Sequence, residues 1–163
     1  AQLRASTVAS RPTTGPYVAT RARRNRGSDV STNAANVSVR RLVSVLITDV
    51  ARSRAFYTGV LGLKEIARPR TFDFVVVWFE LGNQQLHLLL KERADTISPR
   101  HFALRVADVG QARAYCKAKG LSVEETTPIP GADRFFIHDP DGNRIEVIQW
   151  LRPYDPARDG IKA

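Results

Sequence analysis

The chain has 163 residues, 43% of them apolar and 25% charged, so it is long enough for one folded domain with a substantial core. A single cysteine, Cys116, excludes an intramolecular disulfide framework and a zinc-finger cluster. The longest apolar runs, near residues 75–79 and 86–90, are far too short to cross a bilayer, so the sequence predicts no membrane span.

The net charge of +9 is concentrated at the N-terminal end of the chain. Residues 1–40 hold seven arginines and one acid, whereas the remainder holds 18 basic and 15 acidic side chains. Ten of these first forty residues are Ser or Thr, and they show no apolar periodicity. We therefore expect a basic arm that does not fold by itself. Its composition is typical of an organellar transit peptide, and targeting to the chloroplast ranks ahead of targeting to the mitochondrion.

Two interpretations of residues 1–40 remain open. The arm docks on a larger protein assembly, or it is an inert basic tail. Its arginines suit an acidic protein surface or phosphate groups equally well. A nucleic-acid role ranks last, because the rest of the chain is nearly balanced in charge and carries no nucleic-acid-binding motif.

The predicted elements follow one order twice. Residues 42–48 form a β-branched apolar strand, Asp49 caps a helix that ends before Gly62, and three strands follow near 64–67, 72–81 and 84–90. In the second half, a strand at 101–106 precedes a helix from 109 to about 119 and strands near 121–125, 134–137 and 144–150. Residues 153–163 are expected to form an extended tail.

The two halves are an internal repeat with a constant offset of 59 residues. Asp49 falls on Asp108, and the same offset places His87 on Glu146. The predicted fold is therefore α+β, with two tandem βαβββ modules over residues 41–152 that form one cupped mixed sheet.

Two motifs carry a resemblance to a known family. They are Asp49-Val50-x-Arg52-Ser53-x-x-Phe56-Tyr57 and Asp139-Pro140-Asp141-Gly142-Asn143-x-Ile145-Glu146. Together they resemble the vicinal-oxygen-chelate (VOC) superfamily, which includes glyoxalase I, extradiol dioxygenases, and fosfomycin- and bleomycin-resistance proteins. The resemblance spans residues 41–150, and it implies the fold more strongly than a particular reaction.

The resemblance implies four inward-facing positions, on the first and last strands of each module: Leu42, His87, His101 and Glu146. Two imidazoles and a carboxylate suit a divalent ion such as Zn, Ni, Mn or Fe. The resemblance also implies that Glu146 is the catalytic base. Leu42 has no donor atom where metal-binding members usually carry His or Gln. A three-ligand metal site and a degenerate site that binds no metal therefore both remain open.

Arg105 follows His101 by four residues, so strand alternation places both side chains on one face. We expect Arg105 to bind a substrate carboxylate or phosphate, or else to lie in solvent at the rim. Trp78 and Phe79 either wall the cavity or pack in the core, and core packing is the preferred interpretation for each. The predicted function is a metal-dependent lyase or dioxygenase for a small oxygen-chelating substrate. The alternative is a catalytically degenerate subunit, held by its arm in an organellar complex. The cup closes within one chain or across a homodimer.

Overall fold

The computed structural model describes residues 42–161, so the arm predicted at residues 1–40 lies outside the described residues. The first half contains β1 (Leu42–Ile47), α1 (Val50–Arg54), η1 (Ala55–Val60), β2 (Lys64–Ile66), β3 (Val76–Leu81) and β4 (Gln84–Leu90). The second half contains β5 (His101–Arg105), α2 (Val109–Ala118), β6 (Glu124–Glu125), β7 (Ala132–His138), β8 (Arg144–Trp150) and α3 (Pro156–Asp159).

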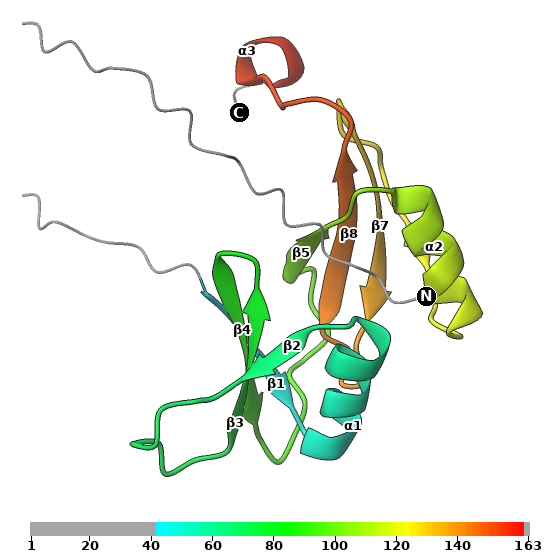
Figure 1. The fold of residues 1–163 in the computed structure, drawn as a ribbon. Helices are drawn as coiled ribbons and strands as arrows, with labels where there is room; N and C mark the ends of the chain where they lie inside the picture. Colours follow the sequence, from blue (N-terminus) through cyan, green and yellow to red (C-terminus); the bar gives the residue numbers. More distant parts are fainter. Residues whose placement is uncertain (1–41, 162–163) are drawn as a thin grey trace, which may run out of the picture.

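Each half forms a four-stranded sheet, in the orders β1-β4-β3-β2 and β5-β8-β7-β6 (Figure 1). In both sheets the first strand runs parallel to the last strand of its module, and the other pairs are antiparallel. The two halves therefore share one topology. The predicted α+β fold with tandem βαβββ modules is confirmed.

The two main helical segments begin in the same way. Asp49 accepts a hydrogen bond of 2.9 Å from the N–H of Arg52, and Asp108 accepts one of 2.8 Å from the N–H of Gln111. These side chains satisfy N–H groups that have no partner within the helix. The aspartates that the repeat aligns are thus both helix N-caps.

The first helical segment continues from α1 into the π-helical turn η1. Here the N–H of Leu61 donates to the carbonyl of Phe56, five residues earlier, at 3.0 Å. Such turns widen the helix locally. Phe56 and Tyr57 of this segment are both buried in the core.

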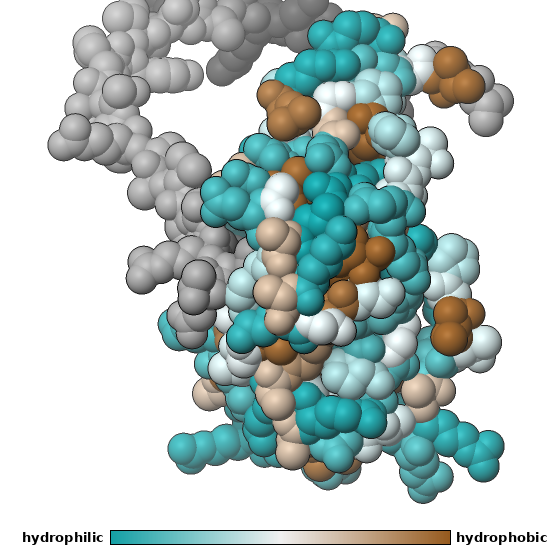
Figure 2. Space-filling view, turned by 90° about the vertical axis from the view of Figure 1, so that its right-hand side faces the viewer, coloured by the Kyte–Doolittle hydropathy of each residue, from teal (hydrophilic) through white to brown (hydrophobic). Residues whose placement is uncertain are grey.

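One hydrophobic core lies between the helical segments and both sheets. Its largest fully buried side chains are Tyr57, Phe79, Phe135, Ile47, Leu86, Leu88, Ile137 and Ile145. In Figure 1 both α1 and α2 lie at the right-hand side of the molecule. That side is mostly hydrophilic, and its apolar areas are separated from one another (Figure 2).

The opposite face of each sheet carries the residues that alternate with the core positions along the strands. We call these surfaces the open faces. The first open face includes Leu42, Ser44, Trp78, Gln85 and His87, and the second includes His101, Arg105, Arg134, Phe136 and Glu146.

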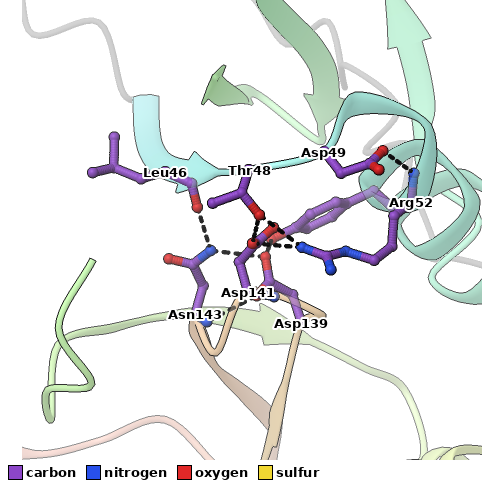
Figure 3. A network of polar contacts seen from close by, with 8 residues as sticks. Leu46, Thr48, Asp49, Arg52, Asp139, Asp141 and Asn143 are labelled. Atoms are coloured by element: carbon purple, nitrogen blue, oxygen red, sulfur yellow. Dashed lines mark hydrogen bonds and ion pairs between the residues drawn. The ribbon is translucent and has the colours of Figure 1, made fainter. Parts of the chain in front are cut away.

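The turn between β7 and β8 joins the second module to the first (Figure 3). The Asn143 amide donates to the carbonyl oxygen of Leu46 at 2.7 Å. Asp141 accepts a hydrogen bond of 2.6 Å from Thr48 and forms an ion pair of 2.7 Å with Arg52. The second family motif therefore has a structural role, because it fixes the position of one module on the other.

The C-terminal segment differs from the extended tail that the sequence predicted. It contains α3, whose N-cap Asp155 accepts from the N–H of Ala157 at 2.9 Å, and Pro156 stands in the first turn. Arg152 donates two hydrogen bonds, of 2.6 and 2.9 Å, to Asp159. Over residues 42–161, no helix is long and apolar enough to cross a membrane.

Candidate functional site

His87 lies on the first open face, between Leu86 and Leu88, which are both fully buried in the core. Its ring stacks on the indole of Trp78 with 4.0 Å between ring centres, and its Nε2 lies 3.0 Å from Oε1 of Gln85. Burial lowers the pKa of His87 below its usual value, because desolvation disfavours the charged ring. The neutral imidazole is the form that binds metal ions.

His101 and Glu146 lie together on the second open face, with 3.7 Å between His101 Nε2 and Glu146 Oε2. The other ring nitrogen of His101, Nδ1, lies 2.8 Å from the carbonyl oxygen of Pro99. A carbonyl oxygen can only accept, so Nδ1 carries a proton and Nε2 is the ring nitrogen that faces Glu146. Metal-binding histidines are commonly held in this way through their second nitrogen.

Glu146 is 7% exposed, and a second charged partner lies on its other side. Arg134 donates from Nη1 to Glu146 Oε1 at 2.7 Å and from Nη2 to the carbonyl of Thr127 at 2.9 Å. The two carboxylate oxygens therefore have different partners. Oε1 is bound to a guanidinium group, and Oε2 faces His101.

Two of the three predicted metal ligands thus come together within one chain. His101 and Glu146 offer a nitrogen and an oxygen to one point, and this donor set fits a divalent cation. His87 stands on the other sheet. Among residues 42–161, no three side chains of His, Cys, Asp or Glu are grouped closely enough to hold an ion. Leu42 is half-exposed at the start of β1 and offers no donor atom.

Arg105 is exposed at the end of β5, and it makes no ion pair with any residue of the described range. It shares a face with His101, because Phe102 and Leu104, which alternate with these two residues along β5, face the core. His138 lies at the end of β7, where its Nδ1 is 3.5 Å from Glu124. The free guanidinium of Arg105 is therefore available to an anionic group above the second open face.

The family model described as the Glyoxalase/Bleomycin resistance protein/Dioxygenase superfamily matches residues 41–147, which include most of both modules. The chain belongs to this superfamily. The resemblance seen in the two motifs is thereby confirmed, and the match covers residues 41–147.

Among curated proteins, "Glyoxylase I 4" of Arabidopsis thaliana is 29% identical over 116 residues, which cover 64% of this chain and 67% of that protein. Among solved structures, a glyoxalase family protein of Bacillus anthracis has a TM-score of 0.64 and 26% identity, covering 71% of this chain and 97% of that one. The lactoylglutathione lyase of Agrobacterium tumefaciens has a TM-score of 0.56 and 27% identity, covering 71% and 96%.

Sequence reasoning missed one member of this candidate site, Arg134, and gave the core the preference over the cavity wall for another, Trp78. Phe79 does lie in the core, whereas Trp78 stacks on His87 at the open face, which agrees with the alternative that the sequence had ranked second. The two-residue turn at 82–83 contained the signal for this contact, because it pairs Leu81 with Gln84 and therefore Trp78 with His87. The indication for Arg134 in the sequence was weaker, because its position beside Glu146 can be inferred only once β7 is known to pair with β8.

Proposed function

We propose that this protein is a metal-dependent enzyme that acts on a small substrate with two neighbouring oxygen atoms. The observation that carries the proposal is the His101–Glu146 pair, in which Pro99 fixes the ring so that Nε2 faces the carboxylate at 3.7 Å. The relatives described above, "Glyoxylase I 4" and a lactoylglutathione lyase, favour a lyase over a dioxygenase.

His87, His101 and Glu146 would hold the ion, and Zn, Ni, Mn and Fe are the candidate metals. When bound, the ion acts as a Lewis acid that stabilises negative charge developing on a substrate oxygen. Glu146 would serve as the base that accepts a substrate proton, because its carboxylate lies on the open face beside the ligand His101. Arg105 would pair with a substrate carboxylate or phosphate.

We further propose that the site is completed across a homodimer. The open face that bears His87 and the open face that bears His101 belong to different sheets, and the helical segments cover neither of them. A second copy related by two-fold symmetry would supply His87 to the His101–Glu146 pair, and each dimer would then contain two equivalent sites.

Metal content of the purified full-length protein tests the proposal. Elemental mass spectrometry should find nearly one ion per chain in the wild type and little in a His87→Ala, His101→Ala double variant. His138→Ala is the matched control, because this third histidine pairs with Glu124 outside the proposed ligand set, so its metal content should stay at the wild-type level. Wild-type protein that carries no metal after growth and purification with added metal salts would overturn the proposal.

Mixed dimers test whether the ligands come from two chains. A His87→Ala chain and a Glu146→Gln chain should each lose the metal when purified alone. After the two chains are unfolded and refolded together, half of the dimers are mixed, and each mixed dimer regains one intact site. About a quarter of the wild-type metal content should therefore return. If every site were built within one chain, mixing would restore none.

Leu42 and the Arg134–Glu146 pair favour a second candidate function, a binding or scaffolding subunit without metal. Leu42 cannot coordinate, and Arg134 already neutralises the Glu146 carboxylate. In this case the predicted arm would hold the protein in a larger assembly. Removal of residues 1–40 should then abolish association with a large complex in cell extracts, and neither the wild type nor the ligand variants should bind metal.

A further inference from the structure

Arg134 is a charged side chain in direct contact with Glu146 to which the proposed reaction assigns no role. We propose that Arg134 is a positioning residue for Glu146: it engages one carboxylate oxygen, leaves the other oxygen directed toward His101, and weakens the binding of a divalent cation at the pair. This inference rests on the proposed function, because it concerns the same carboxylate. It predicts how one arginine sets the metal affinity of the site.

Burial explains why Glu146 needs a partner besides a metal ion. Its cross-strand neighbours on β5 and β7 are Ala103 and Phe136, neither of which can pair with a carboxylate. The Glu146 side chain is 10% exposed, and a carboxylate so buried is costly without a counter-charge. Arg134, which is 16% exposed, supplies that charge from within the fold.

The guanidinium group of Arg134 is held from two directions. Nη1 donates to Glu146 at 2.7 Å, while Nη2 donates to the backbone carbonyl of Thr127 at 2.9 Å. Its central carbon also lies 5.6 Å from the centre of the Phe136 ring, which supports it from the sheet. A group fixed at both ends restricts rotation of the carboxylate, so Oε2 stays directed toward His101.

This arrangement has two consequences for a cation at Oε2. The ion can use only one oxygen of Glu146, because Oε1 is already engaged by Arg134. The ion also meets a positive charge across the carboxylate, in a partly buried place where screening by water is reduced. Arg134 has one opposing effect: because it already restricts the Glu146 side chain, less conformational entropy is lost when the ion binds. The repulsion between the ion and the guanidinium group is the larger of the two effects. The net effect of Arg134 is weaker metal binding.

The sign of this effect separates Arg134 from an ordinary neighbour of a metal ligand. Carbonyl or carboxylate groups that hold a ligand raise metal affinity, and their removal typically costs about 10–100-fold. Pro99 has this role for His101. Arg134 carries the opposite charge, so its neutralisation should strengthen metal binding.

The experiment measures the dissociation constant of Zn²⁺ for the full chain, by competition with a chromophoric chelator. We compare the wild type with Arg134→Met, with Arg134→Gln, which keeps hydrogen-bond donors, and with Arg134→Lys, which keeps the charge. Arg144→Met is the control, because Arg144 lies 3.5 Å over Phe136 on the same sheet but is not bonded to Glu146. Circular dichroism and thermal unfolding show which variants are folded.

We expect Arg134→Met and Arg134→Gln to bind Zn²⁺ at least tenfold more tightly than the wild type, with Arg134→Lys and Arg144→Met within about threefold of it. Folded Arg134→Gln that binds Zn²⁺ as weakly as the wild type, or more weakly, overturns the inference while leaving the proposed function intact. Zn²⁺ binding by the Met and Gln variants but not by the wild type supports the inference and overturns the proposed function. If no variant binds Zn²⁺, both fail.

Discussion

The hydroxyl of Tyr57 donates a hydrogen bond of 2.8 Å to Asp139, although the two residues are 82 positions apart in the chain. Tyr57 belongs to the helical segment of the first module, and Asp139 begins the turn between the last two strands of the second. The same carboxylate accepts from the backbone N–H groups of Asp141 and Asn143, at 2.9 and 2.8 Å. This buried contact couples the two modules through residues of both family motifs.

Loss of this hydroxyl should lower the free energy of unfolding. We expect Tyr57→Phe to cost about 1–2 kcal/mol, because it leaves one lone pair of a buried carboxylate without its donor. Urea unfolding followed by circular dichroism measures the change. Tyr115→Phe is the control, since its hydroxyl donates at 2.9 Å to a neutral acceptor, the carbonyl of Val60, in a less buried place. An equal or larger loss in the control would contradict the prediction.

The contact between Tyr57 and Asp139 should also make the stability of the protein depend on pH in the alkaline range. Burial, together with the negative charge of Asp139, raises the pKa of Tyr57 well above its usual value of 10.0. The unfolded chain therefore ionises first, so this contribution to stability is present below about pH 10 and is lost as the pH rises further, by about 1.4 kcal/mol per pH unit. Tyr57→Phe lacks the group, and its stability should approach that of the wild type between pH 8 and about pH 11. A difference that stays constant over this range would exclude the raised pKa.

The order of the elements from β1 to β8 was accessible from the sequence because local signals set it, whereas β3, β6 and β7 begin two to four residues away from their predicted starts. Asp49 and Asp108 cap helices, and the turn at 82–83 sets the register of β3 and β4. A strand period of two also places His101 and Glu146 on one face. In a βαβββ module the first strand pairs with the last strand. The proximity of His101 and Glu146 therefore follows from the pairing of β5 with β8.

The rest of the site could not be predicted, because it depends on how separate elements meet. The distance of His87 from His101 and Glu146 depends on the angle between the two sheets, and the spacing of residues along the chain gives no information about that angle. Arg134 reaches Glu146 diagonally between β7 and β8, and the carbonyl of Thr127 in a separate loop holds its guanidinium group. The tail helix was missed although Asp155 and Pro156 form a recognisable helix start.

His87, on the first open face, should titrate with a pKa below the usual value for histidine. Because burial lowers the pKa of His87, we expect its NMR titration midpoint below the usual 6.5, and Trp78→Leu should move the midpoint upward by exposing the ring. The unfolded chain binds this proton more readily, so the contribution of His87 to stability is lost as the pH falls below about 6.5. Trp150→Leu, which alters the other tryptophan, should leave the midpoint unchanged. An equal shift in both variants would refute the role of the stack.

A single methyl group added at Gly131, where Arg152 of the C-terminal segment packs on the second module, should lower the free energy of unfolding. Gly131 and Gly82 both adopt positive φ, of 80° and 61°, so alanine strains each by about 1 kcal/mol. A Cβ at Gly131 would also lie 2.8 Å from Cγ of Arg152, whereas one at Gly82 would meet no atom within 4 Å. We expect Gly131→Ala to lower stability by about 1 kcal/mol more than Gly82→Ala, because Arg152 must move away from Asp159. Urea unfolding compares the two, and equal losses would show that Arg152 moves freely.

Replacement of Leu42 by a residue with a metal-binding donor atom should raise the affinity of the protein for Zn²⁺. It lies at the start of β1 beside Gln85, two residues before Ser44, which pairs with His87. If His87 binds the proposed ion, Leu42→His adds a nitrogen ligand on the same open face, and we expect Zn²⁺ to bind about tenfold more tightly than to the wild type. Leu42→Phe controls for ring size without a donor atom and should leave Zn²⁺ binding unchanged. Equal Zn²⁺ affinities in the two variants would place residue 42 outside the coordination sphere.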